Sequence, residues 1–253
     1  DFIRKRHETT YIKGDIMKLL VTGGAGFIGN CFVRHILNKY PDYQVINIDA
    51  LTYCGNLENL KDVENNPNYK FVLGNICDRK LVRELVSEVD CIVNFAAESH
   101  VDNSIKHPEV FIETNVQGTL NLLQSAKEVG IERYLQVSTD EVYGTLGKTG
   151  YFYETTPLAP NSPYSASKAS ADMLVRAFYE TYKLPVLTTR CSNNYGPYQY
   201  PEKLIPFFIS RLLNGEKVPV YGDGLNVRDW LYVYDHCAAI DTVLHKGKIG
   251  EVY

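Results

Sequence analysis

Tyr164 and Lys168 have the types and the spacing needed for proton transfer. They are four residues apart, just after the helix-start pattern at 161–163, so their side chains share one face of a helix. A lysine ammonium beside a tyrosine favours the phenolate, and lowering a phenol pKa from about 10 toward 7 takes roughly 4 kcal/mol. We therefore expect Tyr164 to act as a base on a hydroxyl group.

Thr139, Asp140 and Glu141 follow an apolar run, at the point where a strand would end. Two adjacent acids are often a solvated turn, but a strand end that faces a cofactor favours a catalytic interpretation. Hydride transfer needs only a hydroxyl near the tyrosine. An additional acid and base therefore indicate a further step, such as removal of a proton beside a carbonyl and protonation of a leaving hydroxyl.

The spacing of the first pair occurs again at Tyr179 and Lys183. This second pair would lie about 22 Å further along the same helix, so only one pair can be at the site. Tyr164 and Lys168 are near the helix start and face the strand ends. We interpret Tyr179 and Lys183 as residues of a helix surface.

The stretch 18–29 must position a cofactor beside these groups. Its apolar start predicts a strand, and three glycines then follow at intervals of three residues. Gly23 permits a tight turn, Gly26 lets the backbone approach a pyrophosphate, and Gly29 lets the next helix pack closely on the sheet. The free N–H groups at the start of that helix would face the phosphates.

Asp49 ends the next apolar run, where a carboxylate can accept hydrogen bonds from an adenosine ribose. No arginine or lysine lies at positions 50–60 to pair with a 2′-phosphate. The sequence therefore predicts NAD rather than NADP as the cofactor.

Apolar runs and helix-like stretches alternate through most of the chain, which predicts repeated βαβ units. The further strands are expected at 69–73, 91–95, 134–138 and 186–190, and the helices at 78–87, 108–129 and 163–182. The expected fold class is α/β, a doubly wound parallel sheet of the Rossmann type. Ligands collect at the carboxyl ends of such strands.

Three segments are expected along the chain. Residues 1–16 have mixed charges without periodicity and are interpreted as a leader or a remnant of cloning. Residues 17–190 form the predicted NAD-binding domain. Turn residues, an apolar helix at 204–213 and a final strand at 250–253 assign 191–253 to a smaller substrate lobe, which we expect to be incomplete at its C-terminal side.

Composition excludes several classes of function. The net charge of -4 argues against nucleic acid as a partner. Six cysteines without a CxxC pattern, and no metal-ligand spacing of histidines, predict reduced thiols and no metal site. No apolar run approaches the roughly 20 residues that span a membrane. We expect an intracellular, cytoplasmic protein.

With these motifs assembled, the chain from Met17 to Tyr253 resembles the extended short-chain dehydrogenase/reductase family. Its broad motifs are 23–29 and 164–168. Narrower motifs resemble the branch that dehydrates nucleotide sugars, and they lie at 49–56, 96–102, 138–144, 190–197 and 228–230. Epimerases and decarboxylases of the superfamily are less similar around Asp140 and Glu141.

The resemblance implies a reaction on a nucleotide sugar, dTDP-glucose, in deoxysugar biosynthesis. The sugar would be oxidised at C4, lose water across C5 and C6, and be reduced at C6 while NAD stays bound. Tyr164 would deprotonate the 4-hydroxyl, Glu141 would remove the C5 proton, and Asp140 would protonate the departing 6-hydroxyl. Thr139 would hydrogen-bond the reacting sugar oxygen.

The candidate binding residues form two sets. Those expected to hold NAD are Gly23, Gly26, Phe27, Ile28, Gly29, Asp49, Asn75, Ile76, Ala96, Ala97, Thr114, Tyr164 and Lys168. Those expected to hold the substrate are Ser99, Thr139, Asn193, Lys203, Pro219, Tyr221 and Arg228. The resemblance also implies a homodimer built from the helices at 108–129 and 163–182.

Asn75, Asn103 and Tyr234 depart from the family pattern, in which Asp, Arg and Glu are more frequent. We expect them to change packing or affinity without touching the reacting groups. His100 is compatible with a buried histidine or with a neighbour of the substrate. Two alternatives stay open: an epimerase or decarboxylase for another nucleotide sugar, and an NAD-binding chain without turnover.

Overall fold

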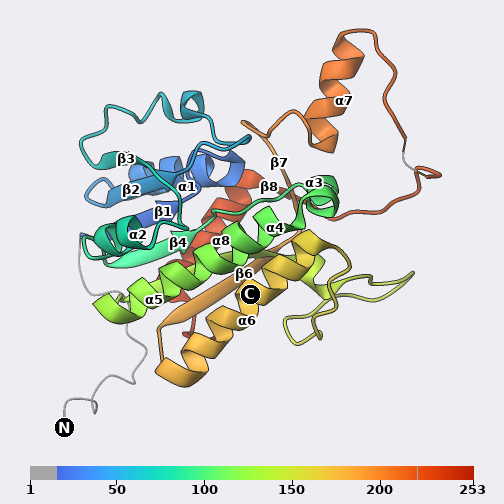
Figure 1. Cartoon of the computed structure of the whole chain (residues 1–253). Coiled ribbons are helices and arrows are strands. Elements are labelled where there is room, and N and C mark those ends of the chain that lie inside the picture. The colour runs from blue at the N-terminus through green and yellow to red at the C-terminus, as the bar shows by residue number, and fades with distance from the viewer. Residues whose placement is uncertain (1–15, 221) are drawn as a thin grey trace.

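A computed structural model describes residues 16–220 and 222–253 (Figure 1). The expected leader, apart from its last residue, and the candidate substrate residue Tyr221 lie outside the described residues. All statements below concern the described part of the chain.

Six parallel strands form the central sheet, as predicted. They are β1 (Lys18–Thr22), β2 (Gln44–Asp49), β3 (Tyr69–Leu73), β4 (Cys91–Asn94), β5 (Arg133–Thr139) and β6 (Val186–Cys191). The strand order is β3-β2-β1-β4-β5-β6. The direction of winding reverses between β1 and β4, and this is where a doubly wound sheet opens a crevice for ligands.

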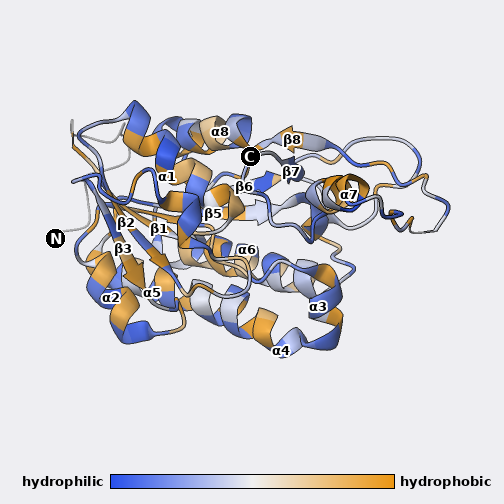
Figure 2. Ribbon diagram, turned by 90° about the horizontal axis from the view of Figure 1, so that it is seen from above, coloured by the Kyte–Doolittle hydropathy of each residue, from blue (hydrophilic) through white to orange (hydrophobic). Residues whose placement is uncertain are grey.

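Helices cover both faces of the sheet (Figure 2). One layer holds α1 (Phe27–Lys39) and α8 (Val233–Lys246), and the other holds α2 (Arg79–Val86), α5 (Thr119–Val129) and α6 (Pro163–Tyr182). Side chains alternate along each strand. Leu19 and Val21 of β1 therefore pack in the core under α1 and α8, whereas Leu20 packs in the core on the other side.

The predicted helix at 108–129 consists of three consecutive segments. They are α4 (Pro108–Phe111), a π-helical segment η2 (Ile112–Gly118) and α5. A short helix α3 (Val101–Lys106) precedes them. Widened π turns often mark functional sites, and η2 carries Thr114, one of the candidate cofactor residues.

The helix that carries the candidate base begins and ends as predicted. Ser162 and Ser165 form a capping box at the start of α6, with Pro163 in the first turn. At its end Lys183 adopts a left-handed conformation with φ of 56°. The capping box fixes the helix start, and with it the place of Tyr164 in the first turn.

The region after β6 divides into two parts. A two-stranded parallel sheet of β7 (Asn193–Tyr195) and β8 (Trp230–Tyr232), together with α7 (Leu204–Leu213), lies away from the main sheet (Figure 1). No residue of α7 is buried. The start of a substrate lobe is expected in this part, and that role stays a prediction.

The remaining part corrects the predicted division at residue 190. Val233, Cys237, Ile240 and Leu244 of α8 are fully buried in the core that includes β1 and α1. After α8 the chain runs beside β6, where Tyr253 N–H donates to the Thr188 carbonyl at 3.0 Å. Residues 233–253 therefore pack on the sheet domain, because the apolar face of α8 is buried there and not in a separate lobe.

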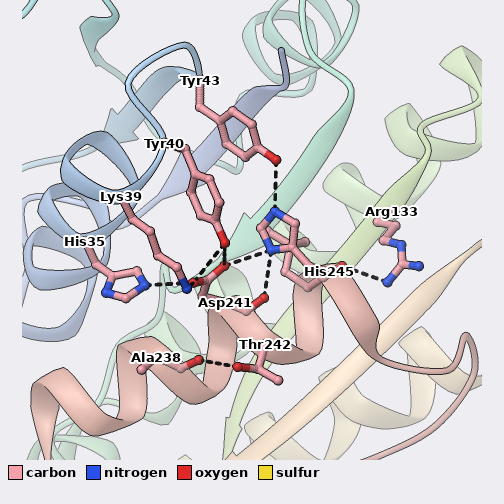
Figure 3. A network of polar contacts seen from close by, with 10 residues as sticks. His35, Lys39, Tyr40, Tyr43, Arg133, Ala238, Asp241, Thr242 and His245 are labelled. Carbon is pink, nitrogen blue, oxygen red and sulfur yellow. Dashed lines mark hydrogen bonds and ion pairs between the residues drawn. The ribbon is translucent and has the colours of Figure 1, made fainter. Parts of the chain in front are cut away.

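A buried carboxylate fixes α8 to α1 (Figure 3). Asp241 accepts hydrogen bonds from His35 Nε2 at 2.8 Å, Lys39 Nζ at 2.6 Å and Tyr40 Oη at 3.0 Å. His245 Nδ1, one turn further along α8, lies 2.8 Å from the same carboxylate. The side chain of Asp241 is only 1% exposed. A charge in that position requires such partners.

Candidate active site

The candidate site is a cleft at the carboxyl ends of the strands. It contains all five predicted catalytic residues and every predicted cofactor residue. Of the candidate substrate residues, Ser99, Thr139, Asn193 and Lys203 also line it. Elements that are far apart in sequence therefore converge on one cavity, as the topology of the sheet requires.

The glycine turn after β1 has the predicted close approaches. Gly23 has a φ of +70°, and a Cβ atom there would lie 2.8 Å from the Ala96 backbone. A Cβ atom on Gly29 would clash with the Gly23 carbonyl. Helix α1 starts at Gly26 without a side-chain cap. Its first N–H groups are thus available to an anion, which fits the pyrophosphate of a dinucleotide.

Asp49 ends β2 in the cleft and also braces the glycine turn. Its carboxylate accepts hydrogen bonds from Ala25 N–H at 2.9 Å and Leu51 N–H at 2.8 Å. Burial raises the pKa of Asp49, and these two N–H groups oppose the shift. Asn47, two residues earlier, accepts from Gly24 N–H at 3.0 Å. The bracing role of this pair was not predicted, although a polar residue inside an apolar strand was a visible signal.

The opposite wall of the cofactor region contains Asn75, Ile76, Ala96, Ala97 and Thr114. Asn75 Oδ1 accepts from Cys77 N–H at 2.9 Å, so this departure from the family pattern serves the turn after β3. The uncapped helix start, the Asp49 carboxylate and these small residues together fit an NAD molecule.

Asn115 of η2 supports the site from behind without lining the cleft, and the sequence prediction missed it. It is 2% exposed and links the chain after β4 to α6. Its Oδ1 accepts from Glu98 N–H at 2.8 Å, and its Nδ2 donates to Ser167 Oγ at 2.8 Å. A single asparagine on a helix gave no signal in the sequence, because its two partners come from other elements.

Tyr164 and Lys168 both line the cleft from the first turns of α6. Lys168 is buried, and its Nζ donates to the Val137 carbonyl at 2.8 Å. Burial raises the pKa of Tyr164, Glu141 and Cys191 raise it further, and a hydrogen bond with Thr139 opposes the shift. The expected lowering of this pKa is therefore not a property of the protein alone, because the phenol is buried beside acidic groups.

The acid pair stands on a short 3-10 helix, η3 (Asp140–Tyr143), directly after β5. Thr139 caps this helix, accepting from Glu141 N–H at 3.3 Å and donating to Asp140 Oδ1 at 3.2 Å. Burial raises the pKa of Asp140. Glu141 is exposed to the open cleft, and partial loss of its hydration and then the charge of Asp140 raise its pKa. The pKa of each acid is thus closer to neutral pH than the pKa of an ordinary carboxyl group.

The candidate substrate residues divide into two groups. Lys203 Nζ donates to the Ser99 carbonyl at 3.3 Å, which joins the two sides of the cleft. Pro219 and Arg228 are exposed and do not line the cleft. The positive charge of Arg228 nevertheless lowers the pKa of Asp140 and Glu141, so its electrostatic influence reaches the site. Pro219 lies on the exposed loop after α7, and its place near the base of the nucleotide stays a prediction.

The other histidine and tyrosine candidates lie outside the reacting centre. His100 caps α3, where its Nδ1 accepts from Asn103 N–H at 3.2 Å, and it is neither buried nor isolated from polar groups. Tyr179 packs over Gly250 near the end of α6, and Lys183 is exposed. The interpretation of this pair as helix surface holds for Lys183, which is the exposed cap after α6, but not for Tyr179, which is half-buried against the core.

The Rossmann sheet, the glycine turn and the Tyr164–Lys168 pair define a dinucleotide-dependent enzyme of the short-chain dehydrogenase/reductase class. Within that class, the chain belongs to the family described as GDP-mannose 4,6 dehydratase, whose model matches residues 20–253.

Named relatives give a finer comparison. A dTDP-glucose 4,6-dehydratase from Xanthomonas campestris is 59% identical over 245 residues, which are 92% of this chain and 69% of the relative. A solved dTDP-glucose 4,6-dehydratase from Bacillus anthracis, in complex with NAD, is 61% identical with a TM-score of 0.88 and covers 94% of this chain and 74% of its own. The enzyme from Streptomyces venezuelae, with NAD and dTDP bound, is 55% identical with a TM-score of 0.91 and the same coverage.

Proposed function

We infer that the chain is an NAD-dependent lyase that converts dTDP-glucose to dTDP-4-dehydro-6-deoxyglucose with loss of water. The observation that carries this inference is the position of Asp140 and Glu141 in the same cleft as Tyr164 and Lys168. A base beside the nicotinamide site suffices for oxidation of an alcohol, but elimination of water needs a second base and an acid. The named relatives support dTDP-glucose as the substrate.

When bound, NAD would supply the hydride acceptor for the oxidation and the hydride donor for the later reduction of the sugar. The chain supplies the proton transfers. Tyr164 takes the proton of the 4-hydroxyl, and Thr139 holds the reacting oxygen. In the protein alone the phenol of Tyr164 is held in its neutral form, so the positive nicotinamide ring is needed to favour the phenolate.

Glu141 and Asp140 then divide the elimination between them. A C4 carbonyl makes the C5 proton acidic, and Glu141 removes it. Asp140 donates a proton to the 6-hydroxyl, which leaves as water, and a proton returns to C5 when C6 is reduced. The raised pKa of both carboxyl groups suits these roles, since it makes Glu141 a stronger base and keeps Asp140 closer to its protonated form.

Lys203, Asn193 and Ser99 are proposed to hold the sugar diphosphate, because they line the same cleft and are not among the residues expected to hold NAD. Arg228 is proposed to reach the diphosphate from the loop before β8. Among the described residues it donates to its neighbour, the Val227 carbonyl, at 2.8 Å. An ammonium and a guanidinium are the groups that best complement a diphosphate.

Incubation with NAD and dTDP-glucose, followed by mass spectrometry, tests the function. The expected product is lighter by one water. An unchanged mass with inverted stereochemistry would identify an epimerase. Loss of carbon dioxide from a uronic acid substrate would identify a decarboxylase. Binding of NAD without any change in the sugar would identify a binding chain, and preferential turnover of GDP-mannose would correct the nucleotide.

We also propose that two copies of the chain pair through α4, η2 and α6. Val110, Ile112 and Met173 on these elements are large apolar side chains that are at least 40% exposed, and exposed apolar side chains of this kind mark candidate interfaces when they lie together. Light scattering after gel filtration should give twice the chain mass, and Met173→Glu should give a monomer. The six free cysteines support the proposed cytoplasmic location.

A further inference from the structure

Three residues of α6 at intervals of four lie on one face of that helix: Tyr164, Lys168 and Asp172. The first two belong to the active site. The third is 3% exposed and lies deeper under the sheet. Burying a carboxylate one turn from a buried ammonium costs free energy unless the two charges stabilise each other.

Arg190 holds Asp172 in place. Its Nε donates to Asp172 Oδ2 at 2.9 Å, and the side chains are only 7% and 1% exposed. Burial raises the pKa of Asp172, and the charge and hydrogen bond of Arg190 oppose that shift. Because a guanidinium keeps its charge at any pH relevant to a folded protein, Arg190 favours the ionised form of Asp172.

Asp172 lies one turn from Lys168 on the same face of α6, so its charge favours the protonated form of this lysine. Burial lowers the pKa of Lys168, and the negative charge of Asp172 is the largest influence that raises it again, followed by Cys191. The hydrogen bond from Nζ goes to the Val137 carbonyl, so Asp172 acts on the ammonium through its charge. Neither Asp140 nor Glu141 is among the groups that support it.

Arg190 also contacts the element that carries the acid pair. Its Nη1 donates to Tyr143 Oη at 2.9 Å, and its guanidinium lies 5.0 Å from the centre of the Tyr143 ring. Tyr143 ends the 3-10 helix that begins at Asp140. One buried arginine therefore connects the side of the site that transfers the first proton with the side that eliminates water.

We propose that Asp172 is the counter-charge that keeps Lys168 protonated, and that Arg190 positions Asp172 for this task. Both are positioning residues that do not touch the sugar or the cofactor. This inference rests on the proposed function only for its effect on turnover. Its electrostatic part concerns the protein alone.

The test replaces Asp172 by Asn, which keeps the shape and removes the charge. In protein labelled with ¹³C-lysine, the Lys168 Cε resonance, assigned with Lys168→Met, reports protonation of this side chain. We expect Asp172→Asn to lower the titration midpoint of Lys168 by at least one pH unit. The alkaline limb of the pH profile for dTDP-glucose turnover should move to lower pH by a similar amount. A tenfold change in the protonation equilibrium of Lys168 corresponds to one pH unit.

Two variants separate charge from packing. Asp172→Glu keeps the carboxylate and should keep the midpoint near that of the wild type. Asp241→Asn is the matched control, because it also removes a buried paired carboxylate but on the opposite face of the sheet. It should lower thermal stability without moving the Lys168 titration. An unchanged midpoint in Asp172→Asn, or an equal shift in Asp241→Asn, overturns the proposal.

If Asp172→Asn does not fold, Tyr143→Phe removes only the hydroxyl that Arg190 contacts. A smaller downward shift of the Lys168 midpoint is then expected, and no shift overturns the proposal. If the wild-type chain forms no dehydrated sugar, the proposed function fails, and the titration still decides the role of Asp172.

Discussion

Asp241 and the pair formed by Asp140 and Glu141 are carboxylates in two regions of one domain, and their surroundings act on them in opposite directions. Although burial raises the pKa of Asp241, hydrogen bonds from His245, Lys39 and His35 lower it well below its usual range. Burial raises the pKa of Asp140 and of Glu141. The surroundings thus favour the charged form of the carboxyl group in Asp241 and the neutral form in Asp140 and Glu141.

The difference lies in the kind of donors that the fold provides. Asp241 accepts from an ammonium, a phenol and two imidazoles (Figure 3). Asp140 accepts one side-chain hydrogen bond, from Thr139, and its other donors are uncharged backbone N–H groups. A carboxylate paired with a cation is stable and chemically inert, whereas one with neutral donors in a partly buried site exchanges a proton more readily. The first arrangement serves the fold, and the second serves catalysis.

Glu141→Gln should produce the largest effect, because it removes the base that is proposed to take the C5 proton. We expect loss of water to slow by about 10²–10⁴-fold, while oxidation at C4 remains measurable as a transient absorbance of NADH at 340 nm. Mass spectrometry of the sugar checks the dehydration. Persistent dehydration would show that another group removes the C5 proton.

Asp241→Asn should destabilise the fold and leave turnover per folded molecule unchanged. Removing one partner of a buried ion pair costs about 3–5 kcal/mol, and the lower end is expected here because Lys39 is 52% exposed. The free energy of unfolding from urea titration measures the effect. Lys39→Met, which removes the most exposed of the donors, is the milder control, and a larger loss in that variant would contradict this account.

A region can be predicted from the sequence when the residues that form it are close together along the chain. The glycine turn, the base and the acid pair are local patterns, and the alternation of strands and helices brings them to one edge of the sheet. Asp241 and His35 are 206 positions apart. In the sequence, His35 and Asp241 are polar residues on separate helices, and nothing in either helix identifies the partner.

The residues after β6 also show that packing between distant segments cannot be predicted from local patterns. Residues 233–253 were assigned to the substrate lobe because a change of texture near Cys191 marks a boundary, but it does not show where the chain returns to the sheet. Only the packing of Val233 and Cys237 against the core of α1 settles that point. The roles of residues on exposed loops, such as Pro219 and Arg228, are harder still to predict. No local sequence pattern shows which groups such residues will contact.

Lowering the pH should reduce the advantage of wild type over Asp241→Asn. The folded-state pKa of Asp241 lies below its unfolded value of about 4. The contribution of this carboxylate is therefore complete above about pH 4 and is lost as the pH falls through the folded-state pKa. Urea titrations of both proteins at pH 7 and near pH 3 check this. A constant difference between the two proteins would mean that the carboxylate acts by packing alone.

Asp140→Asn should have the smallest effect and the opposite sign. The pKa of Asp140 is raised on folding, so its ionised form costs stability above the unfolded pKa of about 4, and that cost disappears when both states are protonated at low pH. The group is only partly buried, so the expected gain at pH 7 is below about 1 kcal/mol. It should vanish near pH 3. Urea titration at both pH values measures it, together with loss of dehydration. A variant that is inactive yet less stable at pH 7 would show that Asp140 belongs with Asp241 as a structural carboxylate, and the distinction between the two regions would fail.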